Sequence, residues 1–192
     1  GKESTVKSIV TFDGELERAD KGQAITLTLE DEIDISRGEM IVKKGYLPTS
    51  AKEFNAHVVW MHEDELEKGR EYYIKQGSKM TTGHVVDIEH RVDVNTMETS
   101  EVSLLALNEI GSVNFEVAET LHFDSYQKNP ATGAFIIIDR LSNITVGAGM
   151  ITDAIVQQKE HTYSEFEIEF NALVRKHFPH WGTRDIKKIF NS

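Results

Sequence analysis

Apolar and polar residues alternate in several short segments of the chain, with the period of two that is typical of half-buried β-strands. Residues 113–117 are the clearest example, because valine and phenylalanine at every second position are separated by asparagine and glutamate. Short alternating segments between Gly- and Asp-containing turns predict a mainly β fold. Further strands are expected over residues 24–29, 40–42, 54–61 and 72–74, and as one bent strand or two between residues 85 and 94.

Residues 129–151 contain two more predicted strands that are joined by a turn. Phe135–Ile138 is a short apolar run rich in β-branched residues, and a second run follows the serine and asparagine at 142–143. Gly147 and Gly149 lie in the second run. These two glycines leave little side-chain bulk where that strand meets its neighbour.

The C-terminal part changes to the spacing of an amphipathic helix. Ser164 and Glu167 fit a capping box at its start, and Pro179 ends it at or before Phe178. A polar connection over residues 154–163 precedes it, and a short helix over 185–190 follows. The residues at helical spacing are Phe166, Phe170, Leu173, Val174 and His177.

Composition excludes several classes of protein. The 192 residues include no cysteine, which excludes disulfides, thiolate metal sites and cysteine nucleophiles. No apolar run approaches the roughly 20 residues that span a bilayer, so we expect a cytoplasmic protein without a membrane segment. The net charge of −11 repels phosphate and argues against nucleic-acid binding.

Clusters of charged residues predict no metal site. The acidic residues at 62–67 lack the ligand spacing of a calcium loop, and a solvated loop is the better interpretation. His177 and His180 are separated by the helix-breaking Pro179, and no third ligand is evident. We therefore assign no catalytic, cofactor-binding or metal-binding residue.

Five residues are candidates for a partner interface. Asp139 and Arg140 follow an apolar strand and are able to form an interface ion pair. The alternative is an exposed pair that contributes less than about 1 kcal/mol. Phe178, His180 and Trp181 form an aromatic cluster of the kind enriched at interfaces. This cluster docks either on another chain or domain, or back onto its own barrel.

Several stretches resemble the barrel domains of translation-factor GTPases, such as elongation factor Tu. The closer similarity is to a family within that superfamily, the large GTPase subunits of bacterial sulfate adenylyltransferases, for which DEIDISRGE and HFPHWG are the most specific stretches. The resemblance extends over nearly the whole chain. It rests on residues 9–15, 24–42, 58–61, 107–117, 129–151 and 165–186.

The resemblance implies a mainly β fold of two antiparallel barrel modules and a C-terminal amphipathic helix. Residues 1–46 would be the remnant of a second-domain barrel, 47–153 a third-domain barrel, and 154–192 a connector and helical tail. Because the first barrel would lack its earlier strands, its open face is expected to be covered by self-association or by collapse.

The resemblance also implies a function. In this family a small subunit makes adenosine 5′-phosphosulfate from ATP and sulfate, and the large subunit hydrolyses GTP to drive that step of sulfate assimilation and cysteine biosynthesis. The sequence contains no G-x-x-x-x-G-K-[ST] phosphate loop, so this chain is expected to be a non-catalytic C-terminal region. GTP and Mg²⁺ would belong to an N-terminal GTPase domain and ATP to the small subunit, and both of these are the expected partners.

The alternative hypothesis is a nucleic-acid-binding protein. Related barrels of translation factors contact transfer RNA, so an RNA-binding translation-factor fragment is the alternative. The acidic charge and the lack of a basic, aromatic-rich face argue against it.

Overall fold

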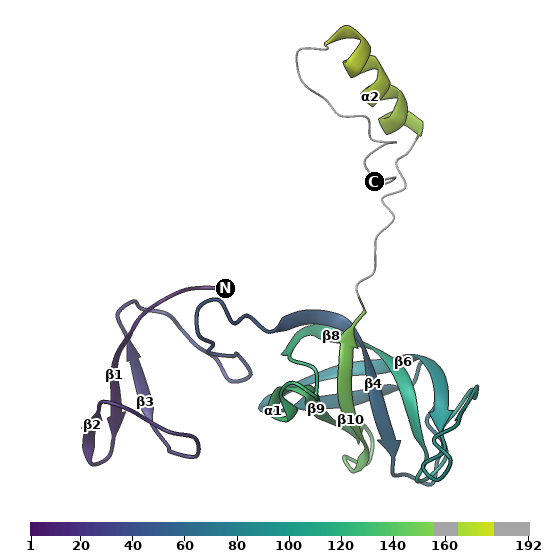
Figure 1. The fold of residues 1–192 in the computed structure, drawn as a ribbon, viewed down its shortest axis with the longest axis horizontal. Coiled ribbons are helices and arrows are strands. Elements are labelled where there is room, and N and C mark those ends of the chain that lie inside the picture. Colours follow the sequence, from purple (N-terminus) through teal and green to yellow (C-terminus); the bar gives the residue numbers. More distant parts are fainter. Residues whose placement is uncertain (156–164, 179–192) are drawn as a thin grey trace. The chain divides into compact units, whose positions relative to one another are not determined.

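The computed structural model describes residues 1–155 and 165–178, and the chain divides into two compact units, Gly1–Val156 and Gln157–Ser192. Strands dominate the first unit and a helix lies in the second (Figure 1). The predicted mainly β fold class is therefore confirmed. The predicted domain limits after residues 46 and 153 stay a prediction.

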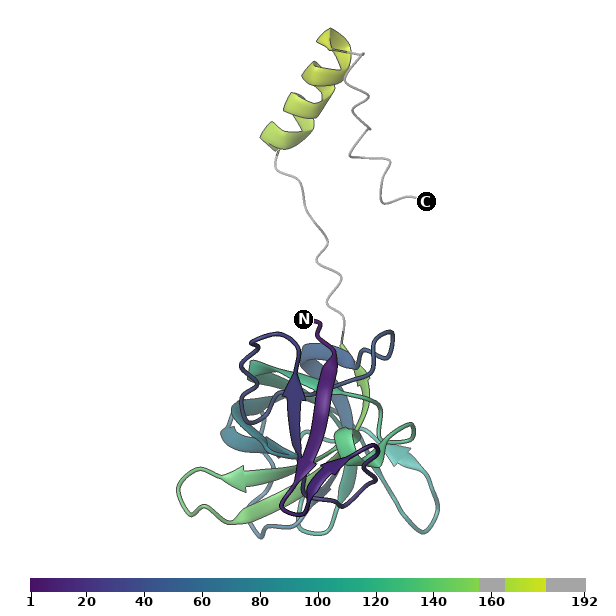
Figure 2. The same ribbon diagram turned by 90° about the vertical axis from the view of Figure 1, so that its left-hand side faces the viewer.

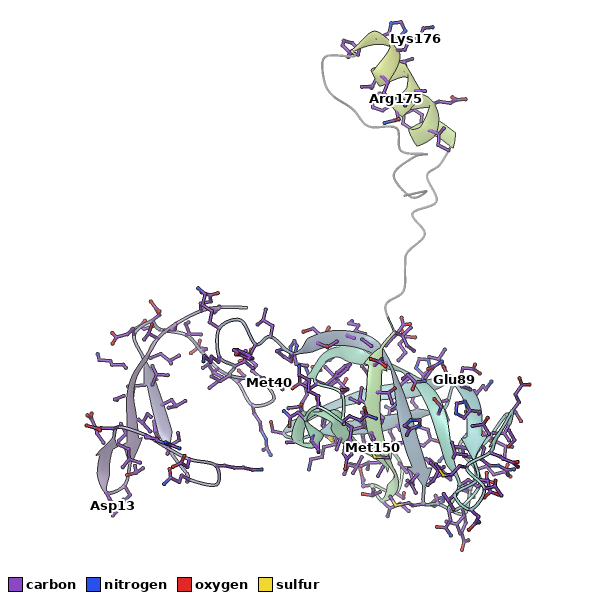
Figure 3. The ribbon with its side chains drawn as sticks, viewed as in Figure 1. Asp13, Met40, Glu89, Met150, Arg175 and Lys176 are labelled. Atoms are coloured by element: carbon purple, nitrogen blue, oxygen red, sulfur yellow. The ribbon has the colours of Figure 1, made fainter. Side chains whose placement is uncertain are left out.

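A three-stranded antiparallel sheet forms the N-terminal module. Its strands are β1 (Val6–Thr11), β2 (Gly14–Leu16) and β3 (Thr26–Leu29), in the order β2-β1-β3. The strands β1 and β3 lie side by side in both views (Figure 1, Figure 2). Asp13 lies at the turn between β1 and β2 (Figure 3).

The strand predicted over residues 40–42 is wrong. This segment lies between two turns in which Gly38 and Gly45 adopt φ angles of +96° and +85°. The apolar side chains of Ile41 and Val42 are exposed. A strand needs a neighbour for its backbone groups, and the described residues place none beside this segment.

Six antiparallel strands follow one another in the order β5-β9-β10-β4-β8-β6. The first strand of this order, β5, pairs with β9 and also with the last strand, β6, so the sheet closes into a barrel. The barrel strands are β4 (Thr49–Trp60), β5 (Glu71–Gln76), β6 (Lys79–Val92), β8 (Ile110–Phe123), β9 (Ala134–Asp139) and β10 (Thr145–Ala154). A short strand, β7 (Thr99–Ser100), pairs with the end of β6. Between residues 85 and 94 the sequence predicts either one bent strand or two. The structure has a single strand there, β6, and its register against β8 shifts twice.

Aromatic side chains fill the barrel. The ring of Phe54 stacks on Phe115 at 5.6 Å and meets the edges of Phe123 and Phe135. All four rings are buried. Burial of this much apolar surface is the main force that closes the barrel.

The glycines of β10 make room for this core. A Cβ atom on Gly149 would overlap the ring of Phe135, and one on Gly147 would lie 3.1 Å from Trp60. The expectation of minimal bulk at both positions is confirmed.

Two helices complete the described residues. The first, α1 (Pro130–Gly133), was not predicted, although Asn129 caps the backbone N–H of Ala131 and proline occupies the first turn. The second, α2 (Glu165–His177), agrees with the predicted helix. Ser164, Pro179 and the helix expected over 185–190 lie outside the described residues. Neither described helix is long and apolar enough to cross a membrane.

Candidate functional site

The turn between β9 and β10 is built around the carboxylate of Asp139. One carboxylate oxygen accepts hydrogen bonds from the backbone N–H of Leu141 at 3.0 Å and of Ser142 at 2.8 Å, and from the Ser142 hydroxyl at 2.9 Å. Asn143 completes the turn with a φ of +59°, which asparagine tolerates better than most residues. Asp139 therefore fixes the shape of this turn.

Arg70 neutralises the same carboxylate. Its guanidinium donates a 2.7 Å hydrogen bond to the second oxygen of Asp139, whose side chain is buried. The hydrogen bonds from Ser142, together with Arg70, hold the pKa of Asp139 far below its usual range. The Arg70 guanidinium also lies 5.4 Å from the centre of the Tyr72 ring. The carboxylate of Asp139 is thus ionised, and both of its oxygens accept hydrogen bonds in this turn.

Arg140 points to a different partner from its neighbour. Its guanidinium pairs with Glu71 and lies 5.6 Å from the ring centre of Tyr73. Asp139 and Arg140 therefore do not pair with each other; both contact residues at or next to the start of β5. Their participation in a partner interface stays a prediction.

Glu109 organises a second turn at the same end of the barrel, and no motif in the sequence indicates this role. Its carboxylate accepts hydrogen bonds from the backbone N–H of Ala106 at 2.9 Å and from Arg91 at 2.6 Å. These donors lower the pKa of Glu109. Asn108 occupies this turn with a φ of +65°. The arrangement repeats that of Asp139, with a carboxylate that holds a turn and an arginine that holds the carboxylate.

A polar network covers part of the outer barrel surface. Glu89, on β6 (Figure 3), accepts a 2.8 Å hydrogen bond from the Ser112 hydroxyl. The amide of Asn55 donates to Ser112 and to Asn114, and its oxygen accepts from Thr152. These contacts join β6, β8, β4 and β10. Because the network satisfies its own donors and acceptors, we assign it to barrel stability.

The aromatic candidates lie in the second unit. Phe178 is partly exposed just after α2, and its N–H donates to the carbonyl of Val174 at 2.8 Å. His180 and Trp181 lie outside the described residues. The proposed aromatic interface stays a prediction.

Comparison with known families assigns the barrel. A family model described as "GTP-eEF1A C-terminal domain-like" matches residues 53–152, more than half of the chain. The chain belongs to this family. Sup35 complexed with GDP has the same fold over 79% of this chain and 38% of its own, with a TM-score of 0.70 and 14% identity. Identity this low supports the fold alone.

Curated relatives extend this family assignment. The chain is 72% identical to "Sulfate adenylyltransferase subunit 1" of Colwellia psychrerythraea, over 98% of this chain and 40% of the relative. The protein of the same name from Psychromonas ingrahamii is 63% identical, over 98% of this chain and 41% of the relative. The predicted resemblance is therefore confirmed. This member of the GTP-eEF1A C-terminal-like family spans about two fifths of the length of these relatives.

Proposed function

We propose that the chain is the non-catalytic barrel region of a sulfate adenylyltransferase GTPase subunit. The identity of 72% over nearly all of the chain supports this proposal most directly. The region would transmit GTP-dependent rearrangements of a GTPase domain to the small subunit, which makes adenosine 5′-phosphosulfate from ATP and sulfate. Such coupling requires two arrangements that differ in their affinity for the partner.

Nucleotides would bind elsewhere in this proposal. GTP and Mg²⁺ would belong to a GTPase domain and ATP to the small subunit, since the sequence has no phosphate loop. Two buried or half-buried carboxylates of the barrel, Asp139 and Glu109, are used to hold turns. These groups position backbone and form ion pairs.

Calorimetric titration of the purified chain with a non-hydrolysable GTP analogue tests the proposal. The expected result is no heat of binding at micromolar concentrations, with binding by a longer protein that contains the phosphate loop. Micromolar binding by this chain alone would overturn the proposal. Salt-dependent binding of transfer RNA in a shift assay would instead support the translation-factor alternative.

A further inference from the structure

Three connections meet at the end of the barrel where β4 finishes and β10 begins. The backbone N–H of Met61 donates to Val146, that of Asn108 donates to Trp60, and Leu66 pairs with Leu105. Residues 61–71, 93–109 and 139–145 are thereby held beside one another. We call this region the loop end of the barrel.

Six large apolar side chains are exposed on these connections. Two of them, Val94 and Met97, lie beside the short strand β7. The other four have exposed fractions of 43% for Met61, 44% for Leu107, 90% for Leu141 and 47% for Ile144. Leaving such side chains in water on adjacent segments is unfavourable and is typical of interaction sites. We call these four residues the apolar patch.

The backbone that carries the two leucines of the patch is held in position by hydrogen bonds. Leu141 lies in the turn fixed by Asp139 and Arg70, and Leu107 lies in the turn fixed by Glu109 and Arg91. A turn whose backbone is already fixed loses less conformational entropy when a partner binds to it. The two carboxylate-held turns therefore suit a preformed docking surface.

The loop end is also acidic. Its three connections contain ten acidic and three basic residues, a net charge of −7 within 35 residues, whereas the other 157 residues carry −4. Several of these carboxylates are exposed and form no ion pair within the described parts of the chain, namely Glu63, Glu65, Glu67, Glu98 and Glu101. A field of this sign attracts a basic surface.

The charge selects among possible occupants. Nucleic acid and anionic membranes are repelled by carboxylates, and a second copy of the loop end would bring two surfaces of charge −7 together. A protein surface with an apolar centre and a basic rim has none of these costs. We propose, on the basis of the function proposed above, that the loop end docks such a surface on the small subunit.

Calorimetric titration of the chain with the purified small subunit tests this docking surface. Leu141→Ser with Met61→Ser is expected to raise the Kd about tenfold or more, because central apolar contacts dominate binding. The control Met80→Ser with Val86→Ser alters two exposed apolar residues elsewhere on the barrel and is expected to leave the Kd unchanged. Thermal unfolding of each variant verifies that it is folded.

A second set of variants tests the role of charge. Glu63→Gln, Glu65→Gln and Glu67→Gln together are expected to slow association and to flatten its dependence on salt. Glu15→Gln, Glu17→Gln and Glu30→Gln, in the N-terminal module, change the charge equally and are expected to have little effect.

The outcomes separate this inference from the proposed function. If the wild-type chain fails to bind the small subunit, the proposed partnership and this surface are both wrong. If it binds and Leu141→Ser with Met61→Ser binds equally well, only the surface is wrong. If the variants instead abolish dimerisation of the chain, the occupant is a second copy, and the proposed partner chemistry is overturned.

Discussion

The ring of Phe135 occupies the space that a Cβ atom on Gly149 would need, so these two residues of paired strands are complementary in size. Both are buried, and Phe135 also packs on Phe54 and Phe115. Gly149→Ala must displace this aromatic cluster. We expect it to lower the free energy of unfolding by about 2–3 kcal/mol.

Urea denaturation of Gly149→Ala and Gly147→Ala measures this effect. A Cβ on Gly147 would lie 3.1 Å from its nearest neighbours, and small shifts can accommodate that distance. Gly147→Ala should therefore be less destabilising than Gly149→Ala. Equal midpoints for Gly149→Ala and the wild type would contradict the packing described for Phe135.

Phe54 is the aromatic residue around which the barrel core is organised. Its ring contacts three other phenylalanine rings, and its side chain is fully buried. Phe54→Ala leaves a large cavity and is expected to cost about 3–5 kcal/mol of stability. Phe12→Ala removes a fully exposed ring and should cost less than about 0.5 kcal/mol. Guanidinium chloride titration followed by tryptophan fluorescence would distinguish the two.

The stability of the barrel is expected to depend on acid through Asp139. Its pKa in the folded chain lies below the value of about 3.9 for an unfolded chain, so acid protonates the unfolded state first. The stabilisation is therefore complete above about pH 5 and is lost as the pH falls below about 4. Urea midpoints measured between pH 7 and pH 3 should show this loss.

Asp139→Asn tests whether this carboxylate is responsible. The variant removes the ion pair with Arg70 and weakens the turn at Leu141 and Ser142, so its thermal midpoint at pH 7 should fall by several degrees. The acid-dependent loss of stability should also become shallower. Asp13→Asn, at the exposed β1–β2 turn, should keep the wild-type profile. An unchanged acid profile in Asp139→Asn would mean that other carboxylates control this transition.

The local pattern predicts the barrel strands well because strict alternation and short apolar runs rich in β-branched residues are both typical of strands. Residues 113–117 and Phe135–Ile138 lie within β8 and β9, and the bulk-free positions of β10 are glycines. The predicted strand at 40–42 failed because strand pairing is not local, and apolar residues alone do not supply a neighbour. The sequence thus indicates each strand better than it indicates which strands pair.

The candidate site could be predicted only in part. Asp139 and Arg140 are interface candidates because they follow an apolar strand, but Asp139 pairs with Arg70, which is 69 residues away. The second carboxylate-held turn, with Glu109 and Arg91, has no motif that distinguishes it from other charged turns. Ion pairs between charged residues that are far apart in the sequence can be identified only from the folded barrel.

Sedimentation velocity of the chain mixed with the small subunit, without nucleotide, measures whether the two proteins form a complex. We expect a single faster-sedimenting species that contains both proteins and that dissociates as the salt concentration rises. Two species that sediment independently at every salt concentration would show that this barrel region does not dock the small subunit.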